Sequence, residues 1–457
     1  MTIAVLDFGK TNSKLLVFGQ RGEVVFSTRT RPVWRMVDGV RVLDEGALGA
    51  WALGALREAE AAHPGEMLGV MVSAHGCTFA LAREAELVRP ILDYEQELPG
   101  DLAEAVDAGL PPYAETFAPP RPQGFNYGRH MLWLQKIEPQ SFEQASVILG
   151  YPQFWSWWLG GCQVAESSYM GCHSHIWAPA RGDFSSLVDA QGWRAKMPSF
   201  ARAGAIIGEI EVGGRCLAVH NGVHDSNAAL QAYRSLGLDS FTLISTGTWV
   251  IIFNPECPLG ALDPALDMYC NVDVDGRAVP TIGFMGGREF DEIAGPVDAP
   301  VDRAAIQRVI DAGQFALPAF AAAGPFGGRP GRIVPPIERE ADRPAVALLY
   351  VALMIDFCLD AMRSTNAIVI DGGLAAGGVL AELLAQLRPA QAVSEGGISE
   401  GTAAGAAALA FAAHGLDMVL PHPSPVVAGG YRDLDAYRRE WRAQLPPLAG
   451  LRTRATA

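Results

Sequence analysis

The chain has 457 residues, of which 49% are hydrophobic and 19% charged, and its formal net charge is -15. At about 150 residues per domain, this length predicts two or three domains with room for large cores. The acidic balance argues against nonspecific binding to nucleic acid or to an anionic membrane. The net charge does not exclude a phosphorylated ligand, because phosphate sites depend on local loops and metal ions rather than on net charge.

The cysteines and the apolar segments of the sequence indicate in which cellular compartment the protein works. The seven cysteines include no C-x-x-C pair, which favours reduced thiols over a zinc ribbon or a disulfide scaffold. The first residues lack the basic segment and apolar core of a signal peptide. The longest apolar run, 346–362, contains two aspartates and is shorter than the about 20 residues of a membrane span. We therefore expect a buried helix there, a cytoplasmic protein and no membrane partner.

The first predicted element is a strand–turn–strand hairpin. Apolar residues 3–6 lead into the polar stretch 7–14, and apolar residues 15–18 follow it. Asp7 at the strand end is placed to hold Mg²⁺, through its waters. The stretch combines a glycine, which lets backbone approach a ligand, with lysines and with hydroxyl and amide donors suited to an anion. The predicted phosphate-binding residues are Gly9, Lys10, Thr11, Asn12, Ser13 and Lys14. A charged hairpin tip without a ligand is the alternative.

A second candidate site follows the predicted strand 68–72. His75 and Gly76 lie in a glycine-containing loop at the strand exit, where ligand sites of α/β proteins gather. A lone histidine is otherwise more often structural than functional. The cluster 172–175 contains a cysteine and two histidines but lacks further ligands at metal-binding spacing. The aromatic run 154–158 is predicted to be the core face of a helix.

Near the middle of the chain, His224 and Asp225 open an apparent helix. An aspartate at such a position could cap the helix N-terminus. It could also act as a general base that takes a proton from a substrate hydroxyl. Local sequence leaves both open, because Ser226 or Asn227 could supply the cap instead.

A second hairpin lies about half the chain after the first. Apolar residues 242–244 and 249–253 flank a short polar tip that contains Gly247 and Thr248. Two such hairpins suggest a duplicated fold that grips one nucleotide from both sides. Further on, the predicted strand 367–370 runs into a turn with Gly372, Gly373 and Gly377, where backbone can approach a base or phosphate. Neither G-x-G-x-x-G nor a P-loop occurs.

Strand-like runs alternate with alanine-rich helical stretches along the whole chain, which predicts an α/β fold. We expect an N-terminal domain over 1–238 and a C-terminal domain over 239–445. The segment 446–457 has no apolar periodicity and is predicted to be a frayed tail.

The order of these motifs resembles that of the FGGY carbohydrate kinases, members of the actin-like ATPase superfamily. The resemblance covers about residues 3–412. It rests on seven segments: the first phosphate loop 7–14, the sugar-side stretch 89–97, an L-W-L…E-P helix 132–139, a G-x-x-D-x-x-A-A element 222–229, the second phosphate loop 245–248, the adenosine-site turn 372–373 and the closing helix 401–407.

The resemblance implies two duplicated ribonuclease H-like domains with an interdomain cleft. The domain over 1–238 would carry the sugar and phosphate side, and the domain over 239–445 the nucleotide side. It also implies transfer of the γ-phosphoryl of ATP to a hydroxyl of a ketose or polyol, with Mg²⁺ held by Asp7. Asp225 would be the general base, and His75, Gly76, His224 and Asp225 would contact the sugar. The resemblance implies a small-molecule sugar as the binding partner and does not imply nucleic acid. A homodimer is possible.

The chain departs from the family pattern at three positions. Glu95 stands where an aspartate is usual and Glu97 where an arginine is usual, so different sugar contacts are expected there. Gly377 replaces a serine or asparagine that normally helps to hold adenosine. His75-Gly76 resembles xylulose kinases, whereas the Gly-Thr-Trp at 247–249 resembles rhamnulose and fuculose kinases, so the sugar is not identified.

Two other functions fit such a fold. One is an actin- or chaperone-like ATPase that uses the nucleotide for conformational work. The other is a catalytically silent sugar- or nucleotide-binding regulator. The element around Asp225 and the sugar-side stretch favour the kinase over the first. The presence of both Asp7 and Asp225 argues against the second.

Overall fold

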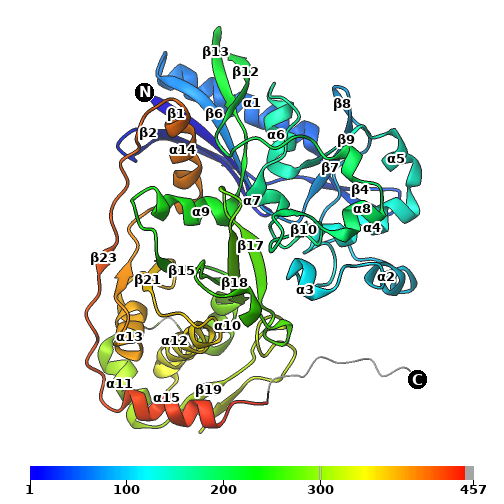
Figure 1. The fold of residues 1–457 in the computed structure, drawn as a ribbon. Helices are drawn as coiled ribbons and strands as arrows, with labels where there is room; N and C mark the ends of the chain where they lie inside the picture. Colours follow the sequence, from blue (N-terminus) through cyan, green and yellow to red (C-terminus); the bar gives the residue numbers. More distant parts are fainter. Residues whose placement is uncertain (298, 300, 448–457) are drawn as a thin grey trace. The chain divides into compact units, whose positions relative to one another are not determined.

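The computed structural model describes residues 1–297, 299 and 301–447, which form two compact units (Figure 1). Unit 1 comprises residues 1–238, 270–278 and 398–421. Unit 2 comprises residues 239–269, 279–397 and the chain from 422 onward. The predicted division at 238/239 coincides with the first passage between units, but it omitted the two later returns of the chain to unit 1. Most of the predicted tail, from residue 448, lies outside the described residues.

Unit 1 is built on a mixed sheet. Its strand order is β12 (Ile206–Val212), β13 (Arg215–His220), β6 (Met67–Ala74), β1 (Thr2–Phe8), β2 (Ser13–Gly19) and β3 (Val24–Thr30), and β14 (Val223–His224) also pairs with β6. Strand β1 is antiparallel to β2 and parallel to β6. Its residues 3–6 are all fully buried, as expected for a central strand covered on both faces.

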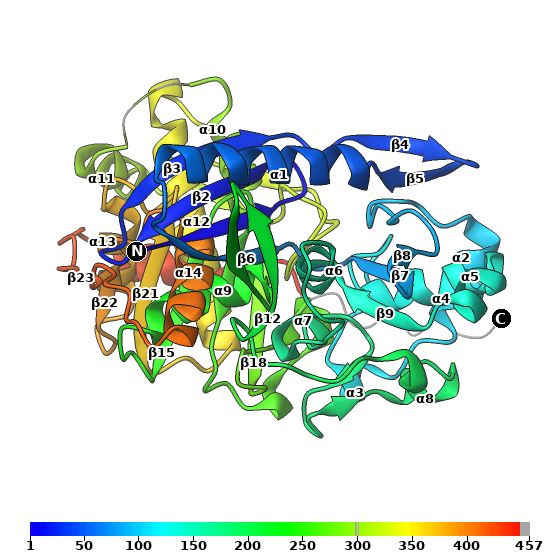
Figure 2. The ribbon, with the colours of Figure 1, turned by 90° about the horizontal axis from the view of Figure 1, so that it is seen from above.

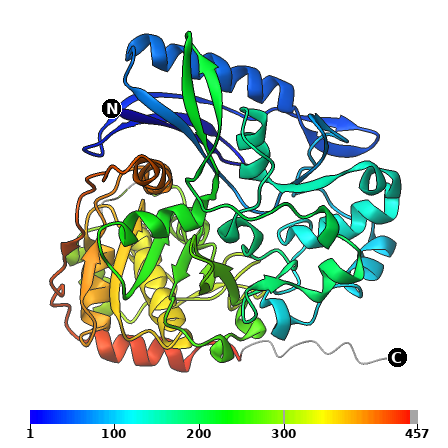
Figure 3. The same ribbon diagram turned by 45° about the horizontal axis from the view of Figure 1, so that its top comes forward.

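Helices cover both faces of this sheet, as Figure 3 shows. Helix α1 (Glu45–Ala62) lies on one face, and α14 (Gly401–Ala413) lies on the other. Helix α9 (Asp225–Arg234) packs closely against α14. At Gly405 an added Cβ would lie 1.9 Å from the backbone oxygen of Ala228, so only glycine permits this approach. The packing fixes the start of α9, where Asp225 stands.

The rest of unit 1 extends from the sheet and includes the hairpin of β4 (Trp34–Val37) and β5 (Val40–Leu43), seen in Figure 2. The aromatic run forms helix α6 (Tyr151–Trp158), with Phe8 stacked on Trp155 at 4.4 Å between ring centroids. Trp155 is fully buried, so this run is core, as predicted. The other elements are β7 (Phe79–Arg83), β8 (Glu86–Leu87), β9 (Val147–Gly150), β10 (Trp177–Ala178), β11 (Asp183–Phe184), α2 (Gly100–Asp107), α3 (Tyr113–Thr116), α4 (Tyr127–Ile137), α5 (Pro139–Gln144), α7 (Ser167–Met170) and α8 (Ser186–Ala190).

Unit 2 repeats the strand arrangement of unit 1. Its sheet contains, in order, β18 (Ala278–Phe284), β16 (Val250–Phe253), β15 (Phe241–Thr246), β21 (Ala367–Gly372), β22 (Val393–Glu395) and β23 (Ser424–Pro425). Strand β15 is antiparallel to β16 and parallel to β21, just as β1 is antiparallel to β2 and parallel to β6. The short strand β17 (Tyr269–Val272) begins where the chain passes into unit 1.

The core helix of unit 2 is α12 (Arg343–Ala361), which packs against α10 (Gly286–Ala294), α11 (Arg303–Asp311) and α13 (Val379–Leu387). Residues 340–361 are long and apolar enough to cross a membrane, but 83% of their apolar window is buried inside the protein. Asp356 on α12 is fully buried and paired with Arg388 at 3.2 Å and with Arg442 of α15 (Leu434–Ala443) at 2.5 Å. Burial and these ion pairs identify α12 as a core helix.

Candidate active site

The first predicted phosphate loop is shorter in the structure than in the sequence prediction. Strand pairing joins Asp7 to Lys14 and Phe8 to Ser13, so the turn itself is 9–12. An added Cβ at Gly9 would lie 2.6 Å from the backbone oxygen of Asn12, and glycine is therefore needed to close the turn. Thr11 and Asn12 are exposed at its tip, whereas Ser13 is buried in β2. The exposed tip presents the donors that an anion would meet.

Asp7 belongs to a group of charged side chains in unit 1. Burial, together with the negative charges of Asp225 and Glu400, raises the pKa of Asp7 to about 7, and the positive charge of Lys14 opposes this rise. Lys14 Nζ lies 2.7 Å from Glu400 Oε2, and both side chains are partly exposed. Glu400, directly before α14, was not singled out in the sequence. Its only sequence signal was its position next to the segment 401–407.

A magnesium ion fits beside Asp7. A buried carboxylate whose pKa is raised by a second carboxylate is a place where a cation is stabilising. Mg²⁺ is commonly held by one or two carboxylates, waters and substrate phosphates rather than by a cage of protein ligands. Among the residues that the structure describes, no group of three His, Cys, Asp or Glu side chains could hold a metal. The residues present therefore suit a phosphate-bound magnesium ion.

Asp225 is the first residue of α9, and its carboxylate is only partly buried, with the side chain 32% exposed. Its Oδ1 atom accepts hydrogen bonds from the backbone N of Ser226 at 2.5 Å and from the Ser226 hydroxyl at 3.1 Å. Burial raises the pKa of Asp225, and His75 opposes the rise. His224 occupies the N-cap position of α9. The hypothesis that Asp225 is the N-cap residue is therefore not supported.

His75 and Gly76 follow β6 and lie in the same region of unit 1 as Asp225. His75 Nδ1 lies 2.7 Å from the backbone oxygen of Gly76, and a carbonyl only accepts, so Nδ1 carries the proton and Nε2 is an acceptor. Burial lowers the pKa of His75 to about 4, and the ring is neutral at pH 7. A Cβ on Gly76 would lie 3.0 Å from His224 Nε2. The glycine thus leaves room for His224.

The structure turns Lys10 toward the sugar-side stretch 89–97. Its ammonium pairs with Asp93 and lies 3.4 Å from Glu95 Oε2. It also lies 3.8 Å from the ring centroid of Trp34. Asp93 is fully buried and lies 3.1 Å from Arg41 Nε. The sequence predicted that Lys10 contacts a phosphate. In the structure its ammonium instead contacts Asp93 and Trp34.

Of these partners, the sequence analysis had placed only Glu95 in the site. Asp93 stands two residues before Glu95, inside a stretch that the motif pattern had marked. Trp34 had no sequence signal. Glu97 is exposed, and its carboxylate accepts a hydrogen bond from Gln123 at 2.5 Å. The two glutamates that depart from the family pattern therefore have different surroundings. Glu95 lies beside the Lys10 ammonium, whereas Glu97 is hydrogen-bonded to Gln123.

The second predicted loop and the glycine turn line a cavity in unit 2. This cavity of about 350 Å³ is lined by Gly247, Thr248, Gly287, Arg288, Asp291, Gly373 and Leu374. A Cβ on Gly287 would lie 2.2 Å from the backbone oxygen of Gly247, and one on Gly372 would lie 1.9 Å from that of Thr246. Glycine is thus required where the hairpin tip meets its neighbours. A glycine-lined cavity suits a phosphate or nucleotide, because backbone can approach the ligand.

The cavity does not include every predicted residue. Gly372 supports the hairpin from outside it, and Gly377 adopts a φ of +95° without lining it. Three lining residues on α10, namely Gly287, Arg288 and Asp291, were missed in the sequence analysis. The Gly-Gly pair 286–287 at the start of a helix was the signal that could have found them.

Comparisons with known proteins agree with the fold. The model of the FGGY carbohydrate kinase C-terminal domain matches residues 238–418. A solved carbohydrate kinase from Novosphingobium aromaticivorans is 33% identical, with a TM-score of 0.87, and the match covers 97% of this chain and 98% of that chain. No curated protein sequence matches significantly.

More distant structures share the fold. A xylulose kinase from Rhodospirillum rubrum is 16% identical, with a TM-score of 0.79 and coverage of 97% of this chain and 98% of that chain. A glycerol kinase from Plasmodium falciparum, determined with ADP, is 11% identical, with a TM-score of 0.76 and coverage of 97% and 96%. The fold is that of the two-domain actin-like ATPases. With the family model and the 33% identical structure, these matches show that the chain belongs to the FGGY carbohydrate kinases, which are phosphotransferases.

Proposed function

We propose that this kinase transfers the γ-phosphoryl of ATP to a hydroxyl of a ketose or polyol, with Asp225 as the general base. The observation that supports this proposal most is the state of the Asp225 carboxylate. Its Oδ1 atom is held by Ser226, while about a third of the side chain stays accessible to a ligand. A fixed and accessible carboxylate next to a second acid, Asp7, suits proton transfer beside a metal-bound phosphate.

Phosphoryl transfer of this kind passes through a loose transition state, so positioning and charge stabilisation dominate catalysis. Bound magnesium would neutralise the charge of the transferring phosphoryl group. Asp7 would hold that ion, and the exposed tip residues Thr11 and Asn12 would offer donors to phosphate oxygens. The cavity with Gly247, Thr248 and Gly373 would receive another part of the nucleotide in unit 2.

On the sugar side, the neutral His75 offers its Nε2 lone pair to a substrate hydroxyl. Asp225 accepts the proton of the hydroxyl that attacks phosphorus. The bond between this oxygen and the γ-phosphorus forms while the bond from the γ-phosphorus to the bridging oxygen breaks, and ADP leaves. The carboxylate of Glu95, which lies 3.4 Å from the Lys10 ammonium, supplies a hydrogen-bond acceptor for another hydroxyl. We also propose that the enzyme acts on a small soluble sugar in the cytoplasm.

The test measures ATP turnover with and without a panel of pentuloses, 6-deoxyhexuloses and polyols. Ligand binding to the native state raises its apparent stability, so a thermal-shift screen can first select the sugars. We expect ADP release that depends on a sugar and equals the amount of phosphorylated sugar formed. Sugar-independent ADP release would instead indicate an actin- or chaperone-like ATPase. Sugar binding without turnover would indicate a regulator.

A further inference from the structure

His224 lies directly before Asp225 and is almost fully buried, with 2% of its surface exposed. Its Nε2 atom lies 3.3 Å from Asp225 Oδ1, and its Nδ1 atom lies 2.9 Å from Asn227 Nδ2. A substrate contact, which the sequence suggested for His224, would need an accessible ring. Both ring nitrogens instead face partners inside the protein.

The contacts of Asn227 determine which nitrogen of His224 carries the proton. Asn227 Nδ2 lies 3.4 Å from the backbone oxygen of Ser168, which can only accept a hydrogen bond. The NH₂ group of Asn227 must therefore occupy this side, since its amide oxygen would be repelled by the carbonyl. The same NH₂ group faces His224 Nδ1. That nitrogen must then accept, and the proton of the neutral ring must sit on Nε2.

The ring of His224 stays neutral at pH 7, because burial lowers its pKa to about 3. Its single proton therefore sits on Nε2, the ring nitrogen that lies 3.3 Å from Asp225 Oδ1. Two hydrogen bonds from Ser226 already reach Oδ1, and the Nε2–H group of His224 is a further donor beside it. A carboxylate oxygen has about two lone-pair sites, so three donors saturate it.

We propose that His224 is a positioning residue for the reaction proposed above. Fixed by Asn227 in the Nε2–H form, it holds Asp225 Oδ1 and leaves Oδ2 as the atom that takes the substrate proton. This inference rests on the proposed role of Asp225 and assigns that role to one atom. The proton of the sugar hydroxyl moves to Oδ2 while the oxygen bonds to the γ-phosphorus. His224 itself neither gains nor loses a proton.

The kinetic test compares His224→Gln with His224→Leu. A glutamine amide can still donate to Asp225 Oδ1, whereas leucine cannot. Residues that orient a reacting group typically contribute about 10- to 100-fold, and we expect His224→Leu to lower kcat by that factor with little change in the KM for ATP. We expect His224→Gln to recover most of the lost kcat. Wild-type kcat in a folded His224→Leu variant would overturn the proposal, and so would equal losses in both variants.

A spectroscopic test is independent of turnover. The protein is labelled with ¹⁵N-histidine, and the His224 signals are identified by their loss in His224→Gln. We expect a protonated Nε2 and an unprotonated Nδ1 in the wild type, and a mixture of both tautomers in Asn227→Leu. A protonated Nδ1 in the wild type would overturn the proposal. If the wild type showed this tautomer but no sugar-dependent turnover, the proposed function would fail while the hydrogen-bond assignment held.

Discussion

The two hairpins of this chain have the same backbone and different chemistry. In each, a central strand is antiparallel to the next strand and parallel to a later one: β1 with β2 and β6, and β15 with β16 and β21. The β1–β2 hairpin carries Asp7, Lys10 and Lys14, and it lies near Asp225. The tip of the β15–β16 hairpin is the neutral stretch 245–248.

This difference is the basis for assigning different parts of the proposed reaction to the two units. In unit 1 the charged groups surround a carboxylate whose pKa is raised by burial. The tip of the β15–β16 hairpin in unit 2 has no charged residue and packs closely on its neighbours, and the positions of Gly287 and Gly372 leave no room for a Cβ. Substitutions of the charged residues around Asp7 in unit 1 should therefore affect catalysis, and substitutions of the close-packed glycines in unit 2 should affect folding or nucleotide binding.

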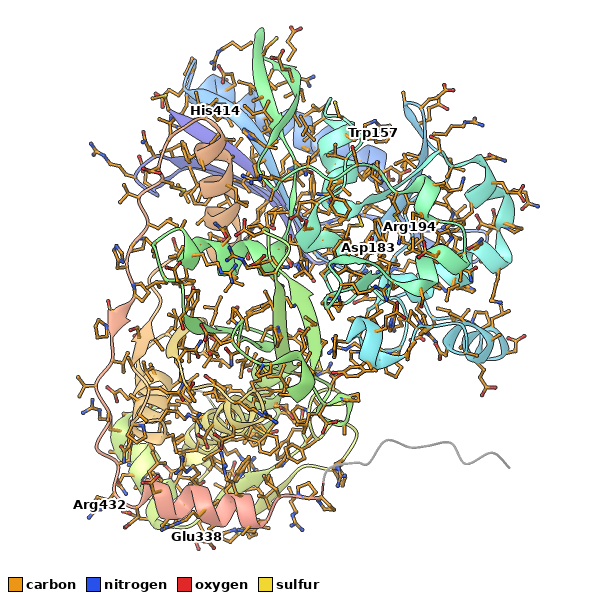
Figure 4. All side chains as sticks on the ribbon, viewed as in Figure 1. Trp157, Asp183, Arg194, Glu338, His414 and Arg432 are labelled. Atoms are coloured by element: carbon orange, nitrogen blue, oxygen red, sulfur yellow. The ribbon has the colours of Figure 1, made fainter. Side chains whose placement is uncertain are left out.

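The largest effect in this comparison is expected from Asp7→Asn. A metal ion contributes several kcal/mol of transition-state stabilisation, so losing its carboxylate should lower kcat at least about 100-fold. The apparent affinity for Mg²⁺ should fall as well, which a titration of rate against Mg²⁺ would show. The matched control is Asp183→Asn, since Asp183 forms an exposed pair with Arg194 at 3.0 Å (Figure 4). Exposed pairs contribute little, so the control should keep wild-type kcat. An equal loss in both variants would contradict the specific role of Asp7.

Two neighbouring glycines of unit 2 should respond differently to alanine. A Cβ at Gly372 would collide with Thr246, and its φ is +100°, so Gly372→Ala should destabilise unit 2 by about 1–3 kcal/mol. Among the described residues, no other group lies within 4 Å of a Cβ at Gly373, which lines the cavity. Gly373→Ala should keep the melting temperature and weaken ATP binding. Thermal denaturation and nucleotide titration would test both, and a stable Gly372→Ala variant would be contrary to this account.

Replacing Asp7 should change how the stability of the protein depends on pH. Its pKa in the folded, metal-free protein is about 7, above the ordinary value of 3.8. The folded state therefore binds more protons than the unfolded state between these values, and this contribution to stability is lost as pH rises from about 4 to 7. Each unit of the shift corresponds to about 1.4 kcal/mol. Asp7→Asn should then raise the melting temperature of the metal-free protein at pH 8 but not at pH 4. If Asp7→Asn changed the melting temperature by the same amount at pH 4 and at pH 8, the raised pKa of Asp7 would be refuted.

The smallest effect on ATP use is expected from Glu97→Arg. Glu97 is exposed and bonded to Gln123, and a carboxylate accepts hydrogen bonds where a guanidinium donates them. We expect the preferred order of sugars to change and the KM for ATP to stay nearly the same. Kinetics on the sugar panel would test this. An unaltered order of sugars would place Glu97 outside the sugar site.

Sequence alone predicted what depends on short-range patterns. Both hairpins follow from apolar runs around polar tips, and the buried helix α12 follows from an apolar run that contains Asp356. The returns of the chain at 270–278 and 398–421 were missed, because they depend on contacts between distant segments.

The direction of side chains was also beyond the sequence. Lys10 was assigned to phosphate, but Asp93 and Trp34, which lie on other elements, hold its ammonium. For Asp225, local sequence allowed a helix cap or a base, and only the structure shows that His224 occupies the cap position. Such features arise from tertiary packing, which no local pattern encodes.

The most direct test of the central claim is single-turnover phosphoryl transfer in Asp225→Asn. Asparagine keeps the size of the side chain but lacks the basicity of a carboxylate. A positioned general base contributes about 10²–10⁴-fold, and we expect transfer from bound ATP to bound sugar to slow by at least about that factor. Sugar and ATP should still bind, and thermal stability should be nearly unchanged. Transfer at the wild-type rate would contradict the account and place the base elsewhere.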